Sequence, residues 1–127
     1  MPEKITILLI DDEYEFLEIT VKRLRRRGYG VRTAMSCGDG LSVLGAETVD
    51  VVILDVMLPD IDGIQCLKEI RRQHPDVSVI LLTGHASMEA GLKSMEYGAS
   101  DYCLKPVELE ELVDRIEIVY RDARRGG

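Results

Sequence analysis

A buried strand that ends in an acid, VVILD at residues 51–55, does most to limit what this chain can fold into. Val51–Leu54 is apolar without alternation, and three of its four residues are β-branched. Such a run is typical of a strand buried on both faces, as in a parallel sheet. The loop residues Pro59-Asp60 follow soon after Asp55. The acid therefore lies at the carboxyl end of a central strand, where open α/β sheets bind ligands.

The pattern of a short strand followed by a helix occurs five times. Strands are predicted at residues 4–10, 31–35, 51–54, 77–82 and 102–104. The first helix has Leu17, Thr20, Val21 and Leu24 on one face and ends at Gly28, whereas the second, at about 38–47, has the weakest pattern. Alternation of this kind predicts an α/β fold with a doubly wound, five-stranded parallel sheet, (βα)5.

Length and charge limit the domain count and the partners. The 127 residues predict one domain over 1–121, followed by a tail or the start of a linker at 122–127. A net charge of −7 argues against binding to nucleic acid or to an anionic membrane by this domain. The basic run at 22–27 is expected to be the solvated last turn of a helix. The N-terminus resembles neither a signal peptide nor a membrane span.

The cysteines and histidines predict no metal site of their own. Cys37, Cys66 and Cys103 are far apart, odd in number and without a CxxC motif, so we expect free thiols in a reducing compartment, the cytoplasm. His74 and His85 are too isolated to suggest zinc.

Polar residues follow four of the predicted strands. Asp11 and Asp12 come after the first strand, Asp55 after the third, Thr83 after the fourth and Lys105 after the fifth. Each alone has an ordinary explanation: a strand-ending turn, a helix cap or a surface charge. Because all strand-to-helix loops leave a parallel sheet at the same edge, these side chains are expected to converge.

The chemistry of such a cluster points to phosphoryl transfer. Two carboxylates about 5 Å apart repel each other by roughly 3 kcal/mol at an effective dielectric near 20, so the cluster needs a cation. Oxygen ligands suit Mg²⁺ rather than zinc or copper. A carboxylate can act as a nucleophile and form an aspartyl phosphate. We expect Asp55 to be that nucleophile, with Mg²⁺, Lys105 and Thr83 each taking one phosphoryl oxygen.

Over nearly its whole length the chain resembles the receiver domains of two-component response regulators. The resemblance rests on Asp11-Asp12, on LDVMLPDIDG around Asp55, on LLTGHAS around Thr83 and on YGASDYCLKP. It implies the flavodoxin-like strand order 2-1-3-4-5. It also implies that Asp55 accepts a phosphoryl group from a histidine kinase or a phosphotransfer protein.

The resemblance assigns further roles to the site residues. Asp12 and Asp55 would coordinate Mg²⁺ together with the backbone carbonyl of Met57, and Asp11 would act mainly through water. Thr83 and Lys105 would bind the phosphoryl oxygens. We expect no turnover of external substrates, only the gain and loss of the chain's own phosphoryl group.

A switch is implied as well. Lys105-Pro106 would be a cis peptide, and Tyr102 would turn inward as Thr83 moves toward the phosphate. The surface formed by the fourth helix, the fifth strand and the fifth helix would then bind a partner, an effector domain or a second copy. Two positions would tune dephosphorylation, Met57 and His85.

Two other functions fit an α/β sheet of this kind. A phosphatase of the haloacid-dehalogenase type would carry a second Asp two residues after the nucleophile, where this chain has Met57. A flavin-binding module would have Gly or hydroxyl residues in its first loop to hold phosphate. That loop is DDEYE, which repels an anion unless a metal is bound.

Overall fold

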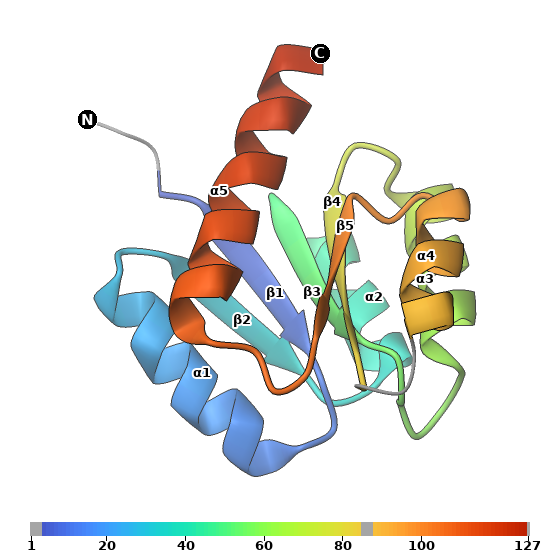
Figure 1. The fold of residues 1–127 in the computed structure, drawn as a ribbon, viewed down its shortest axis with the longest axis horizontal. Helices are drawn as coiled ribbons and strands as arrows, with labels where there is room; N and C mark the ends of the chain where they lie inside the picture. The colour runs from blue at the N-terminus through green and yellow to red at the C-terminus, as the bar shows by residue number, and fades with distance from the viewer. Residues whose placement is uncertain (1–3, 85–87, 127) are drawn as a thin grey trace.

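A computed structural model of the chain describes residues 4–84 and 88–126. Strands and helices alternate along all of it (Figure 1). The strands are β1 (Thr6–Ile10), β2 (Gly30–Ala34), β3 (Val51–Asp55), β4 (Ser78–Thr83) and β5 (Asp101–Leu104). The helices are α1 (Tyr14–Arg26), α2 (Cys37–Ala46), α3 (Gly63–Gln73), α4 (Met88–Glu96) and α5 (Leu109–Gly126). The predicted alternation is confirmed, with most element ends shifted by a residue or two.

The five strands form one parallel sheet in the order β2-β1-β3-β4-β5, which confirms the predicted topology. β3 lies at its centre, with Leu54 beside Ile10 of β1 and Asp55 beside Leu82 of β4. The carboxyl ends of the five parallel strands lie at one edge of the sheet, the lower one in Figure 1. The end of β3 is therefore flanked by the ends of β1 and β4.

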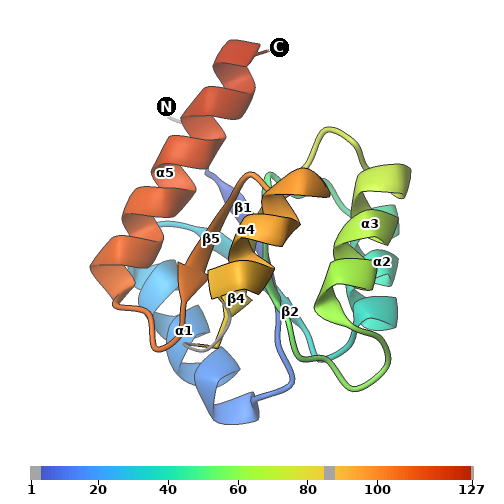
Figure 2. The same ribbon diagram turned by 45° about the vertical axis from the view of Figure 1, so that its right-hand side comes forward.

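Helices cover both faces of the sheet. α1 and α5 lie on one face, and α2 and α3 lie on the other, with α4 beside β4 and β5 (Figure 2). Side chains of β1 alternate between the two cores: Ile7 and Leu9 pack with α1 and α5, whereas Leu8 and Ile10 pack with α2 and α3. All four are fully buried. Double coverage explains why the sequence of the strand shows no polar alternation.

Local signals set the helix ends near the functional edge. Ser36 caps α2 by accepting a hydrogen bond from the Asp39 amide at 3.1 Å, and Asp62 caps α3 by accepting one from the Ile64 amide at 2.7 Å. Gly28 follows α1 with a φ of 94°, a conformation that favours glycine. The sequence also predicts Ser87 as the cap of the fourth helix, but Ser87 lies outside the described residues.

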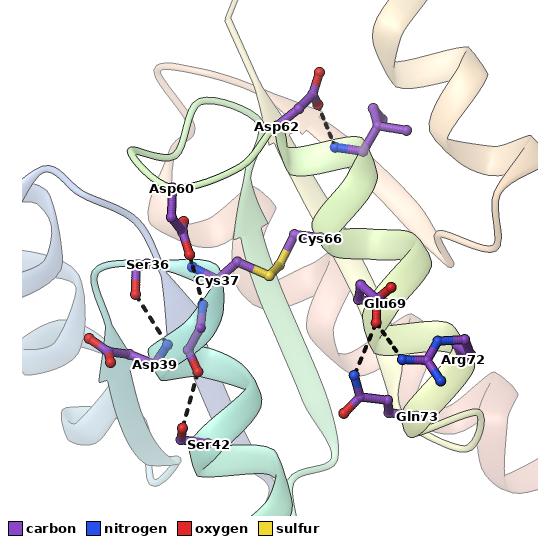
Figure 3. Close-up of a disulfide and its surroundings, with 12 residues drawn as sticks. Ser36, Cys37, Asp39, Ser42, Asp60, Asp62, Cys66, Glu69, Arg72 and Gln73 are labelled. Atoms are coloured by element: carbon purple, nitrogen blue, oxygen red, sulfur yellow. Dashed lines mark hydrogen bonds and ion pairs between the residues drawn. A yellow bond between two sulfur atoms is a disulfide. The ribbon is translucent and has the colours of Figure 1, made fainter.

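The prediction of three free thiols was wrong for two of the cysteines. Cys37 and Cys66 form a disulfide that joins the first residue of α2 to α3 (Figure 3). They are 29 residues apart in sequence, so no spacing motif revealed the pair. Folding brings them together because α2 and α3 cover the same face of the sheet. Only Cys103 is free, and it is buried on the other face.

Ionisation of the Cys103 thiol is expected to lower the stability of the folded protein at alkaline pH. Burial raises the pKa of this thiol to about 11 from an ordinary value of 9.0. Between those values the unfolded chain loses the thiol proton while the folded chain keeps it, so rising pH favours unfolding. We expect this thiol to cost up to about 2 kcal/mol of stability across that range.

Urea unfolding at a series of pH values checks this expectation, with Cys103→Ala as the control. Lysine and tyrosine titrations contribute to both proteins, so the difference in slope belongs to the thiol. Equal loss of stability in the two proteins on going from neutral pH to pH 11 would contradict it.

The C-terminal residues continue the last helix. Residues 122–126, expected to be a tail or the start of a linker, form the final turns of α5, which projects beyond the sheet in Figure 1. Within residues 4–84 and 88–126, no helix has the length and apolar character needed to cross a lipid bilayer.

Candidate functional site

Three carboxylates meet at the carboxyl edge of the sheet. Asp11 directly follows β1, Asp12 comes next, and Asp55 is the last residue of β3. One oxygen from each lies within 4.8 Å of the others. Asp11 is fully buried, Asp55 is 6% exposed and Asp12 is exposed. The sheet thus places a compact acidic cluster where its sequence predicted one, open to solvent through Asp12.

The Lys105 ammonium reaches this cluster from the end of β5, which is separated from β3 by β4. Its Nζ is 2.7 Å from Asp11 Oδ2 and 3.5 Å from Asp55 Oδ2. The side chain is only 18% exposed. One cation therefore offsets two buried carboxylates, and the cluster keeps a net negative charge.

This charge balance shifts the pKa values of both central groups. Burial raises the pKa of Asp55, the charge of Asp11 raises it further, and Lys105 opposes the shift. Burial by itself would lower the pKa of Lys105, but its hydrogen bonds to Asp11 and Glu13 outweigh that effect, so its pKa is raised. Lys105 therefore stays positively charged, whereas the negative charge of an ionised Asp55 is only partly neutralised by it.

The Thr83 hydroxyl is buried with no hydrogen-bond partner among the described residues. Thr83 ends β4, next to β3, and its carbonyl accepts a hydrogen bond from the Lys105 amide at 2.7 Å. A buried hydroxyl that lacks a hydrogen-bond partner destabilises the folded protein. An acceptor brought to this edge of the sheet, such as a phosphoryl oxygen, would satisfy it.

The other predicted site residues fall into three groups. The Lys105-Pro106 peptide is cis, as predicted. Met57 is 76% exposed just beyond Asp55, and Tyr102 is half-buried against the core on the α2 and α3 face. His85 lies outside the described residues.

Three contributors were missed by sequence reasoning. Glu13 accepts a second hydrogen bond from Lys105 Nζ at 3.0 Å, and the ammonium lies 4.6 Å from the centre of the Phe16 ring. Gly63 begins α3 against the backbone after β3: a Cβ there would lie 2.5 Å from Val56 Cα. Asp62-Gly63 is a turn signal in the sequence, but such a signal does not indicate this close approach.

The residues present fit a hard divalent cation. All the ligands available in the cluster are oxygens, which suits Mg²⁺. The buried Asp11 and Asp55 carry more negative charge than Lys105 neutralises, and the exposed Asp12 leaves a side open to solvent. The acidic cluster could therefore hold a metal ion.

Comparisons with known proteins agree with this arrangement. The family model described as the response regulator receiver domain matches residues 7–117 of the chain. The chain is 37% identical over 122 residues to the probable transcriptional regulatory protein TcrX of Mycobacterium tuberculosis. This alignment covers 94% of the chain and 51% of TcrX. It is 33% identical over 124 residues to the transcriptional regulatory protein ZraR of Salmonella typhimurium, covering 98% of this chain and 28% of ZraR. The chain thus spans about half or less of these relatives.

Solved structures share the whole fold. A CheY-like receiver domain protein from Methanospirillum hungatei superposes with a TM-score of 0.92 at 30% identity, covering 98% of this chain and all of that one. NtrX from Brucella abortus, crystallised with ADP, gives a TM-score of 0.93 at 27% identity, with 29% of its length covered. The acidic edge, the strand order and the family match together show that the chain belongs to the response regulator receiver domain family.

Proposed function

We propose that Asp55 accepts a phosphoryl group in a reaction that requires Mg²⁺ and that switches a remote binding surface. The observation that carries this proposal is the cluster of three carboxylate oxygens within 4.8 Å of one another, with Lys105 Nζ 3.5 Å from Asp55. The unpartnered Thr83 hydroxyl on the adjacent strand supports it. A nucleophile, a cation and a hydroxyl donor are what a phosphoryl acceptor needs.

In the proposed step, an Asp55 oxygen attacks the phosphorus atom of the donor. A bond forms between that oxygen and phosphorus, and the bond from phosphorus to the donor breaks, whether the donor is the phosphohistidine of a kinase or phosphotransfer protein or an acyl phosphate. Asp12, Asp55 and the Met57 carbonyl would hold Mg²⁺, with Asp11 acting through water. When bound, Mg²⁺ supplies positive charge to the carboxylates and to the phosphoryl oxygens. Two residues would bind the remaining oxygens, Thr83 and Lys105.

The proposed output surface consists of α4, β5 and α5, which lie side by side (Figure 2). As Thr83 moves toward the phosphate, Tyr102 would turn inward and reset this surface. Large apolar side chains are exposed there: Leu92 is 59%, Met95 44% and Leu104 38% exposed. They would supply contact area for an effector domain, a separate partner or a second copy of the chain.

The place of the domain within a longer regulator is also a proposal. We assign residues 1–121 to the receiver and 122–127 to a C-terminal tail or the start of a linker, of which residues 122–126 belong to α5. Its support is the greater length of TcrX and ZraR. We propose that the domain makes no direct contact with nucleic acid or with a membrane, because its net charge is −7. We also assign it to the cytoplasm, and the support for this is its match to the receiver domain family, because Cys37 and Cys66 form a disulfide and no longer support this assignment as free thiols.

Incubation with acetyl phosphate and Mg²⁺, followed by intact mass spectrometry, tests the function. We expect the mass to increase by one phosphoryl group, and the increase to vanish when Mg²⁺ is chelated. Asp55→Asn removes the nucleophile and should abolish the adduct. Asp39→Asn, which removes an exposed carboxylate on α2 outside the cluster, should leave it unchanged.

An adduct that persists in Asp55→Asn, or that forms equally well without Mg²⁺, would contradict the proposal. Absence of any adduct with acetyl phosphate and with a phosphorylated histidine kinase would contradict it as well.

The adduct is expected to decay slowly. Met57 lies two residues past Asp55 and is exposed, but its side chain cannot position an attacking water through a strong hydrogen bond. Met57→Asn supplies an amide at that place and should shorten the lifetime. Loss of the adduct is followed by mass spectrometry after the phosphoryl donor is removed. A half-life of seconds in the unaltered protein would contradict this prediction.

A phosphatase acting on external substrates is the second candidate. It would need a general acid near the position of Met57, and an exposed apolar side chain stands there. We therefore propose that the domain turns over no external phosphate ester. Hydrolysis of a generic phosphate ester that depends on Asp55 would reverse this assignment.

A further inference from the structure

The Cys37–Cys66 disulfide connects two helices next to the candidate site. Cys37 is the first residue of α2, and Cys66 lies one turn into α3. Their side chains are 1% and 0% exposed, and their Cα atoms are 5.8 Å apart. The chain between them contains β3 and Asp55. The disulfide therefore closes a covalent ring that includes the proposed phosphoryl acceptor.

The starts of α2 and α3 also hold the loop that follows Asp55. Asp60, in that loop, accepts hydrogen bonds from the Cys37 amide at 3.0 Å and the Gly38 amide at 2.9 Å (Figure 3). At the other end of the loop, the Gly63 amide donates to the Val56 carbonyl at 2.8 Å. The start of α2 thus fixes the middle of the loop, and the start of α3 fixes its end.

Residues 56–62 include Met57, whose carbonyl is a proposed Mg²⁺ ligand. The amide of Met57 already faces Asp55, at 3.4 Å from Oδ1. A loop fixed in advance loses less conformational entropy when its carbonyl becomes a ligand. Separation of the starts of α2 and α3 would release Asp60 and the loop together.

We propose that the Cys37–Cys66 pair is a redox-sensitive modification site that sets the Mg²⁺ affinity of the acidic cluster. The disulfide form holds the loop after Asp55 in the metal-binding arrangement, and the dithiol form binds Mg²⁺ more weakly. This inference rests on the proposed function for the identity of the metal and its consequence, phosphoryl acceptance.

The redox step is thiol–disulfide exchange with a dithiol reductant, either a protein dithiol or a small-molecule one. A thiolate of the reductant attacks one sulfur to form a mixed disulfide, and its second thiol then displaces the protein thiol. The protein gains two electrons and two protons and ends with two thiols, while the reductant becomes a disulfide. Because both sulfurs are buried, exchange requires local opening at the start of α2.

Cys103 provides an internal control. It is a free cysteine on the opposite face of the sheet, packed with the α1 and α5 core. Cys103→Ala should therefore keep both the disulfide and its effect on Mg²⁺. Cys37→Ser with Cys66→Ser should resemble the reduced protein at every redox poise.

The experiment equilibrates the full chain with mixtures of reduced and oxidised dithiothreitol, with and without saturating Mg²⁺. Alkylation followed by intact mass spectrometry under denaturing conditions counts the thiols. We expect one thiol in the oxidised protein and three in the reduced protein. Calorimetric Mg²⁺ titration of each form should show weaker binding by about fivefold or more after reduction.

Linkage requires a matching effect of the metal on the redox equilibrium. If Mg²⁺ binds the disulfide form about fivefold tighter, saturating Mg²⁺ makes the midpoint potential more negative by about 20 mV. The thiol count measures this shift without reference to phosphorylation.

Each outcome decides one point. A thiol count that stays at one in the strongest reductant, or equal Mg²⁺ affinity in the two forms with an unmoved midpoint, overturns the redox proposal and leaves the proposed function standing. Failure of both forms to bind Mg²⁺ overturns the proposed function and the redox proposal together. If the double serine variant does not fold, comparison of the oxidised and reduced native protein still decides.

Discussion

Reduction of the Cys37–Cys66 disulfide is expected to lower the free energy of unfolding by about 3 to 4 kcal/mol. The two cysteines are 29 residues apart, and a cross-link of that span removes many conformations from the unfolded chain. The loss is large beside the 5 to 15 kcal/mol or so by which a domain is usually stable. Urea unfolding in the presence and absence of a phosphine reductant measures it.

Cys103→Ala is the matched control for this prediction, because it lacks a thiol but keeps the disulfide. It should lose as much stability on reduction as the unaltered protein. A Cys37→Ala, Cys66→Ala protein should be insensitive to the reductant. Equal stability of the oxidised and reduced unaltered proteins would contradict the prediction.

Lys105→Met is expected to destabilise the metal-free protein by about 3 kcal/mol. Lys105 is the cation shared by the buried Asp11 and Asp55, and its loss leaves two carboxylates facing each other without compensation. Mg²⁺ replaces that charge, and a ligand at a hundred times its dissociation constant adds about 2.7 kcal/mol. The variant should therefore depend on Mg²⁺ for stability more than the unaltered protein does.

Thermal or urea unfolding with and without Mg²⁺ measures both effects. Lys22→Met is the control, because it removes an exposed lysine that pairs only with Glu18 on α1 among the ion pairs described. It should change the free energy of unfolding by no more than about 0.5 kcal/mol. Asp55→Asn added to Lys105→Met removes one of the opposing charges and should restore part of the loss. Equal stability of Lys105→Met and the unaltered protein in metal-free buffer would refute the electrostatic account.

Much of the fold was predictable because its strongest signals are local. The apolar run at 51–54, with three β-branched residues and loop residues soon after it, is typical of a strand covered on both faces. Once five such strands were expected to run parallel, Asp11, Asp55 and Lys105 had to meet at one edge. In the structure, Lys105 Nζ lies 2.7 Å from Asp11 Oδ2 and 3.5 Å from Asp55 Oδ2.

What sequence reasoning missed depends on contacts between distant segments. The disulfide joins α2 to α3 across 29 residues, and Asp60 holds the start of α2 across a similar gap. Glu13 looked like one more acid at the first strand end, but the turn that follows Asp11 points it toward Lys105. None of these pairings has a spacing motif, since each is set by how the helices pack on the sheet.

The most direct test of the central claim is the position of the phosphoryl group. The protein is incubated with acetyl phosphate and Mg²⁺, treated with borohydride, which reduces an aspartyl phosphate to homoserine, and mapped by peptide mass spectrometry. The account predicts homoserine at residue 55, and none there when Mg²⁺ is chelated. Homoserine at Asp11 or Asp12 instead, or modification of Asp55 that does not require Mg²⁺, would contradict it.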